Sequence, residues 1–200
     1  MGCRNAIYAY PFVKKDVITQ MFMEKLIELI KKDELRIKAL NCVQKLNLPH
    51  SYLAAGFVRN LVWDHLHQKP VPTALNDVDV IYFDDTESNP DTHKLIEFEL
   101  SLLMPELNWQ VRNQAIMHER NGDQPYLNII DAMSYWPEKE TAVAIRQLDD
   151  CSYECISAFG FASLFQLQVT YNPKRSRRTF SDRVTLKGWL DKWPNLRTKF

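Results

Sequence analysis

The chain has 200 residues, of which 46% are hydrophobic, 12% are aromatic and 25% are charged, and its net charge is zero. These values are typical of a folded protein and exclude an intrinsically disordered chain, while 5 glycines and 10 prolines exclude collagen-like and low-complexity sequences. No stretch approaches the roughly 18 uninterrupted apolar residues of a membrane helix, and the first residues lack the apolar core of a signal peptide. With four scattered cysteines, the sequence predicts one cytoplasmic domain over residues 1–200, without a disulfide scaffold.

The N-terminal quarter of the chain is predicted to be helical. The sequence begins Met-Gly-Cys, but Ala6 stands where a myristoylation motif requires Ser or Thr, so we expect an ordinary N-terminus. Apolar residues then recur at helical spacing over residues 17–46. A polar break near Asp33 divides this helix in two, and Pro49 ends it. Residues 1–50 are therefore predicted to be a helical extension of a core at residues 51–200.

The core is predicted to alternate between strands and helices. A short apolar run at residues 51–55 stops at Gly56, and residues 57–67 follow as a helix. The other predicted elements are strands at residues 77–83, 109–113 and 141–146, helices at residues 92–103, 125–136 and 182–193, and an apolar segment of either type at residues 159–167. This interleaving predicts an α/β (or α+β) domain with a mixed sheet.

Charge is unevenly distributed along this neutral chain. Residues 174–200 contain nine Lys or Arg residues and two aspartates, so this segment carries +7 and the remainder carries −7. A solvated helix face accounts for such a run, and so does a surface that faces phosphate groups. The sequence leaves both interpretations open.

Two carboxylates in the predicted strand 77–83 indicate a metal site. Because side chains alternate along a strand, Asp77 and Asp79 lie on one face, and Val78 and Val80 lie on the other. Neighbouring carboxylates repel each other unless a cation neutralises them. Mg²⁺ in proteins is held by one or two carboxylates together with substrate phosphates. We therefore expect Mg²⁺ here, with Mn²⁺ as the alternative ion; a surface pair without a metal is the plain structural interpretation.

The junction at Gly56 adds a feature suited to phosphate. A glycine lets the backbone approach a ligand closely, and the following helix N-terminus presents free N–H groups and the positive end of its dipole. Arg59 in the first helical turn can bind a phosphate through two parallel hydrogen bonds. A metal site beside a phosphate site indicates nucleotidyl transfer, in which metal ions activate a hydroxyl and stabilise the leaving pyrophosphate.

Two short motifs carry a resemblance to a known family. The sequences Ala-Gly-Phe-Val-Arg-Asn at residues 55–60 and Asn-Asp-Val-Asp at residues 76–79 resemble the head domain of tRNA CCA-adding enzymes and related polymerase-beta-type nucleotidyltransferases. From residue 53 onward the chain is similar to a nucleotidyltransferase-like family, including Trp-Pro-Glu at residues 136–138 and Lys-Gly-Trp at residues 187–189. This resemblance implies a nucleotidyltransferase-type mixed sheet packed with helices, to which the N-terminal helices are added.

The resemblance also implies roles for individual residues. Asp77 and Asp79 match the catalytic, metal-binding carboxylates. Gly56 and Arg59 match the glycine and the arginine beside the nucleotide triphosphate, and Asn60 follows them. Weaker candidates for nucleotide binding lie at the end of the predicted strand 109–113 and just beyond it, where a base or a sugar could bind; these are Arg112, Asn113 and His118.

The sequence departs from the family's pattern at three places. Ala55 replaces the first glycine of the usual pair, and Asn60 replaces the aspartate of a Val-Arg-Asp motif. The strand at residues 109–113 offers Arg112 and Asn113 where the superfamily often has a third carboxylate. Asp84 and Asp131 are candidate substitutes, with no spacing that selects either of them.

We therefore predict a Mg²⁺-dependent nucleotidyltransferase that moves a nucleoside monophosphate from an NTP to an acceptor hydroxyl, on RNA or on a small molecule. One alternative is a nucleotide-binding or regulatory module that is catalytically weak or inactive because it lacks the third carboxylate. Another alternative is an RNA-binding protein that uses the basic C-terminal segment. No membrane partner is expected.

Overall fold

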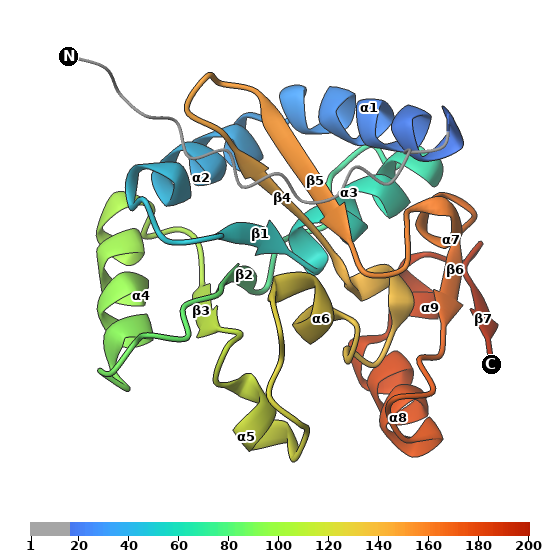
Figure 1. The fold of residues 1–200 in the computed structure, drawn as a ribbon. Helices are drawn as coiled ribbons and strands as arrows, with labels where there is room; N and C mark the ends of the chain where they lie inside the picture. The colour runs from blue at the N-terminus through green and yellow to red at the C-terminus, as the bar shows by residue number, and fades with distance from the viewer. Residues whose placement is uncertain (1–16) are drawn as a thin grey trace.

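A computed structural model of the chain describes residues 17–200, and its centre is a five-stranded sheet (Figure 1). The strand order is β3-β2-β1-β4-β5. Strands β2 and β3 run parallel, and the other neighbours run antiparallel. The strands are β1 (Tyr52–Ala54), β2 (Val78–Tyr82), β3 (Trp109–Asn113), β4 (Val143–Gln147) and β5 (Tyr153–Ser157). The predicted mixed sheet with added helices is confirmed. The expectation of an ordinary N-terminus, which rests on Ala6, concerns residues outside the described part of the chain.

Two helices precede the sheet, as the apolar spacing predicts. They are α1 (Val17–Lys31) and α2 (Glu34–Lys45). Asp33, between the two helices, is the N-cap of α2, and its side chain accepts a hydrogen bond from Arg36 N at 3.0 Å. This capping bond satisfies one of the unpaired N–H groups at the start of α2. The apolar faces of both helices belong to the larger hydrophobic core. The helical extension therefore packs on the sheet domain.

The two faces of the sheet are buried differently. Val78, Val80 and Tyr82 of β2 pack into the larger core, together with side chains of α3 (Gly56–Leu66) and α4 (Thr92–Leu103). Ile81 lies on the opposite face, in a smaller core that includes Met133 of α6 (Ile129–Met133). The smaller core leaves part of this second face open, and Asp79 lies there.

The segment after β3 differs most from its prediction. The helix expected at residues 125–136 is confirmed only at its centre, as α6. It begins late because Asn128 caps its N-terminus by accepting a hydrogen bond from Asp131 N at 2.9 Å. A further short helix, α5 (Met117–Asn121), was not predicted. A turn of 3₁₀ helix (Lys139–Thr141) precedes β4, so β4 begins later than the predicted strand at residues 141–146. The sequence analysis did not predict β5, which pairs with β4 in the antiparallel sense.

The C-terminal segment folds back across the open part of the sheet. It contains α7 (Ala162–Phe165), β6 (Gln168–Thr170), α8 (Arg177–Lys187), α9 (Trp189–Lys192) and β7 (Arg197–Lys199). The helix predicted at residues 182–193 begins earlier and is interrupted at Gly188, whose φ of 59° lies in the left-handed region that glycine favours. Strands β6 and β7 pair in parallel as a separate small sheet. No helix within residues 17–200 is long and apolar enough to span a membrane.

Candidate functional site

A cavity of about 760 Å³ lies between the open face of the sheet and the C-terminal helices. Its first wall consists of the start of α3 and the first half of β2. The second wall is one face of α8 together with α9. A third side follows the end of α6 and contains Tyr135 and Trp136. The predicted residues that line the cavity are Gly56, Arg59, Asn60, Asp77 and Asp79.

The two aspartates line the same cavity, as the alternation along β2 predicts. Asp77 accepts a hydrogen bond from Asn108 Nδ2 at 2.7 Å. Burial raises the pKa of the Asp79 carboxyl, and the nearby Asp77 raises it further, whereas the Arg59 guanidinium opposes this shift. A partly buried carboxylate whose charge is disfavoured in this way is stabilised when a cation binds beside it.

The register of the sheet identifies the residue that faces Asp79 across the neighbouring strand. Asp79 pairs with Gln110 of β3, and the Gln110 side-chain oxygen accepts a hydrogen bond from Arg112 Nη2 at 2.6 Å, so β3 offers no carboxylate beside Asp79. The candidate substitutes are engaged elsewhere: Asp84 accepts hydrogen bonds from Thr86, and Asp131 accepts one from Leu127 N. Within the described part of the chain, no group of three His, Cys, Asp or Glu side chains is arranged to hold a metal ion.

The start of α3 presents backbone N–H groups without a side-chain cap. The chain enters the helix through Ala55, whose φ of 54° is unusual for a residue with a Cβ atom. At Gly56, an added Cβ would lie 3.5 Å from Asn60 Nδ2 and 3.6 Å from an Arg59 Nη, which are ordinary contacts. Internal packing therefore does not require the glycine, whereas a ligand lying against the backbone would.

Arg59 is a buried cation with one unpaired donor. Its side chain is 7% exposed and donates to Thr141 Oγ1 at 2.8 Å and to Asn60 Oδ1 at 3.1 Å. Its Nε atom is buried and has no hydrogen-bond partner in the described structure. Burial lowers the pKa of the guanidinium to about 10, so Arg59 remains charged at neutral pH. A guanidinium that stays charged on a cavity wall is suited to an anionic ligand.

The indole of Trp189 supports the guanidinium of Arg59 from the C-terminal side. The Arg59 Cζ atom lies 4.4 Å from the centre of the Trp189 ring, and Trp63 packs edge-on against Trp189. This cation–π contact holds Arg59 in one orientation. The closing Lys-Gly-Trp motif therefore belongs to the site.

The weaker candidates do not line the cavity. Arg112 forms an ion pair with Glu97 at 2.6 Å, and Asn113 is buried, where its amide donates to Asp84 O at 2.7 Å. His118 is held by the carbonyl of Ala115, which lies 2.8 Å from its Nδ1 atom. All three residues have structural contacts in place of a position in the cavity.

The largest part of the site that the sequence did not predict is the second wall of the cavity, formed by α8 and α9, which we call the C-terminal wall. Thr179, Arg183 and Lys187 of α8 line the cavity at intervals of four residues, which places them on one helix face. The same spacing is present in the basic segment of the sequence. It could have indicated a common face, but only the fold shows that this face lies opposite Asp79.

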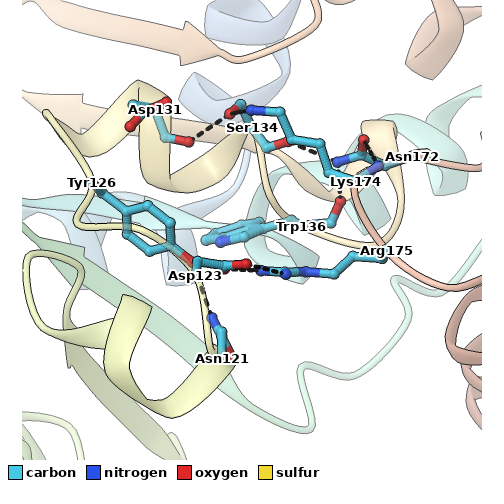
Figure 2. A network of polar contacts seen from close by, with 9 residues as sticks. All are labelled: Asn121, Asp123, Tyr126, Asp131, Ser134, Trp136, Asn172, Lys174 and Arg175. Carbon is cyan, nitrogen blue, oxygen red and sulfur yellow. Dashed lines mark hydrogen bonds and ion pairs between the residues drawn. The ribbon is translucent and has the colours of Figure 1, made fainter.

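A polar network fixes the start of this wall to the segment between α5 and α6 (Figure 2). Arg175 donates to both carboxylate oxygens of Asp123, at 2.7 and 2.5 Å. Asn172 donates to the carbonyls of Ser134 and Trp136, each at 2.7 Å. The Arg175 guanidinium carbon also lies 5.5 Å from the centre of the Tyr135 ring. The network therefore sets where α8 begins relative to the aromatic side of the cavity.

The fold and the cavity together define a nucleotidyltransferase-type domain. The model of the family described as "Nucleotidyltransferase" matches residues 41–198, so the chain belongs to this family. A solved structure described as revealing a CCA-adding enzyme head domain is similar over 88% of this chain and 95% of its own, with 30% identity and a TM-score of 0.77.

More distant structures are two described as tRNA-processing enzymes, at 15% and 16% identity and a TM-score of 0.47 each. The alignments cover 81% of this chain and 44% and 43% of theirs. No curated protein matches the sequence.

Proposed function

We propose that this protein transfers a nucleoside monophosphate from an NTP to an acceptor hydroxyl in a Mg²⁺-dependent reaction. Membership of the nucleotidyltransferase family supports the reaction class. The observation that carries the proposal is a single cavity lined by Asp77, Asp79, Arg59 and the uncapped start of α3. It combines oxygen ligands for a divalent ion with donors for phosphate.

The residues present fit a divalent cation. Two carboxylates on one strand face, together with substrate phosphates, are a ligand set that Mg²⁺ accepts in proteins. Asp77 and Asp79 would hold the ion. When bound, it would activate the acceptor hydroxyl and stabilise the charge on the leaving pyrophosphate.

The chain's own residues bind and orient the triphosphate in this proposal. The N–H groups at the start of α3 receive phosphate oxygens, and Gly56 leaves room for them. Arg59 adds its positive charge on the cavity wall, and Thr141 and Trp189 keep its guanidinium in place. In the transfer, the oxygen of the acceptor hydroxyl bonds to the α-phosphorus and the hydroxyl proton passes to solvent water. The bond from that phosphorus to the oxygen bridging it to the β-phosphorus breaks, and its electron pair leaves with pyrophosphate.

An NMR titration with each of the four NTPs, with and without Mg²⁺, tests the binding step. We expect Mg²⁺-dependent amide shifts around Gly56, Arg59 and Asp79. Asp79→Asn should remove the Mg²⁺ dependence, and Asp85→Asn is the matched control because Asp85 is exposed and lies outside the cavity. No shift with any NTP at millimolar concentration would refute the proposal.

A catalytically inactive nucleotide-binding module is the second candidate, and Gln110 beside Asp79 favours it. Transfer of label from an α-labelled NTP to small RNAs or to small molecules of a cell extract separates the two candidates. Transfer by the wild-type chain that Asp79→Asn abolishes supports the enzyme. Nucleotide binding without transfer to either pool supports the inactive module.

We also propose a cytoplasmic location for this activity. Cys42 and Cys151 form no disulfide within the described residues, and reduced thiols are the usual state in a reducing compartment.

A further inference from the structure

One face of α8 forms the second wall of the cavity. Thr179, Arg183 and Lys187 line the cavity, while Phe180 and Val184 of the same helix are buried in the larger core. The buried residues fix the rotation of α8 about its axis, because residues four apart share a face. The basic side chains at positions 183 and 187 are therefore held on the cavity side.

Arg183 is joined to the opposite wall through a buried carboxylate. Its Nε atom donates to Glu138 Oε1 at 2.6 Å, and Glu138 is fully buried. Thr141 donates to Glu138 Oε2 at 3.1 Å and accepts a hydrogen bond from Arg59. The charge of Arg183 is thus neutralised within the protein, and the contact serves to fix α8 relative to Arg59.

Lys187 has no such partner. No carboxylate within residues 17–200 forms an ion pair with its ammonium group. Lys187 and Asp79 line the same cavity, Lys187 from α8 and Asp79 from β2. Lys192 Nζ donates to the backbone carbonyl of Lys187 at 3.0 Å, which places a second cation beside it.

We propose that Lys187 binds the triphosphate of the NTP from the side opposite α3. This inference rests on the proposed function and adds a residue to it. In the proposed function Asp77 and Asp79 hold the metal, and Arg175 and Arg183 are paired with carboxylates of the protein. Lys192 donates to a backbone carbonyl, whereas no protein acceptor is assigned to the Lys187 ammonium among the described residues, so Lys187 is the lysine of this wall that we assign to the ligand. In the transfer it faces the pyrophosphate that receives the electron pair of the broken bond.

The proposal is tested by comparing triphosphates with monophosphates. Affinities of the full chain for ATP, CTP, GTP and UTP, and for the four corresponding monophosphates, are measured by calorimetry with Mg²⁺. Lys187→Met should weaken the binding of the preferred triphosphate by about tenfold or more, the size expected for one charged hydrogen bond, and of its monophosphate by less than about threefold. Lys187→Arg should restore most of the triphosphate affinity.

Arg178→Gln is the matched control on the same helix. The Arg178 side chain is 91% exposed and does not line the cavity, so this variant removes one positive charge without touching the site. Because Lys187 and Arg178 are both exposed, thermal unfolding of both variants should match the wild type.

Three outcomes would overturn the assignment of Lys187. Lys187→Met could bind the triphosphate as the wild type does, it could weaken monophosphate and triphosphate binding equally, or Arg178→Gln could have the same effect as Lys187→Met. In each of these outcomes the wild type still binds NTP, and the proposed function stands. If the wild-type chain binds no NTP, both the proposed function and the role of Lys187 fall.

Discussion

The backbone at Ala55 allows a direct test of strain at the proposed phosphate site. Ala55 adopts φ 54° and ψ −118°, a region that residues with a Cβ atom rarely occupy. Three hydrogen bonds hold it there: its N–H donates to Val143 O at 3.0 Å, and its carbonyl accepts from Val58 N at 3.2 Å and Arg59 N at 2.8 Å. Such a conformation costs about 1–3 kcal/mol.

We predict that Ala55→Gly relieves this strain, and Ala54→Gly is the control. Both alanines are buried, at 7% and 0% exposure, so each variant loses one buried methyl group, which costs about 0.8 kcal/mol. Each also gains freedom in the unfolded chain, which costs about 0.4–1 kcal/mol. Ala54 has an ordinary φ, so only Ala55→Gly recovers the strain energy. The two free energies of unfolding should therefore differ by about 1–3 kcal/mol, with Ala55→Gly the more stable variant.

Urea unfolding at neutral pH measures this difference. In thermal unfolding, each kilocalorie should separate the two melting temperatures by about 2–4 °C in a chain of this size. Equal destabilisation by the two substitutions would refute the reasoning, because it would show that Ala55 holds no recoverable strain. An Ala55→Gly variant less stable than Ala54→Gly would refute it more strongly.

Two further predictions concern the buried charges of the site. Asp79→Asn should raise the free energy of unfolding at neutral pH, because burial raises the folded pKa of Asp79 and its ionisation therefore disfavours the folded state as the pH rises through that pKa. In acid the carboxyl is protonated, and the stability gained by the substitution should vanish. Urea unfolding of both proteins between pH 4 and 8 checks this, and a stability difference that stays the same across the range would contradict it. Glu138→Gln should lower stability by about 1–3 kcal/mol and weaken NTP binding, because it removes the buried negative charge beside Arg183 and replaces one of the two acceptor oxygens by a donor. Glu119→Gln, at an exposed position, is the control, and a Glu138→Gln variant with wild-type stability and affinity would contradict the expectation.

The sequence predicted the elements whose signals are local. The helix at residues 92–103 and the strand at residues 109–113 have the predicted bounds, and the alternation along β2 places Asp77 and Asp79 in one cavity. These signals depend on neighbouring residues only. Strands β6 and β7 were missed because each has three residues and is stabilised by pairing with a segment about 30 positions away.

The C-terminal wall was missed for a related reason. The charge of residues 174–200 was visible in the sequence, but its direction depends on Phe180 and Val184 reaching the core and on Arg175 reaching Asp123. Neither contact has a local signal. The sequence could therefore not distinguish a solvated basic helix from one whose face lines a cavity.

The three departures from the family's pattern affect the two halves of the site differently. Asn60 still accepts a hydrogen bond from Arg59, at 3.1 Å, so its side-chain oxygen performs the contact that an aspartate would make. Ala55 keeps the backbone turn that a glycine would adopt more easily. Both replacements in the part of the site proposed to bind phosphate are therefore accommodated by the fold.

The part of the site proposed to bind a metal has no such compensation in the described chain. Asp79 pairs with Gln110, whose side-chain oxygen accepts a hydrogen bond from Arg112, and neither Asp84 nor Asp131 lines the cavity. A carboxylate at position 110 would add a third negative charge beside an aspartate whose ionisation burial already disfavours. The substrate phosphates must then supply the ligands that the protein lacks, so metal and nucleotide should bind cooperatively: each should bind more tightly when the other is present, by the same factor.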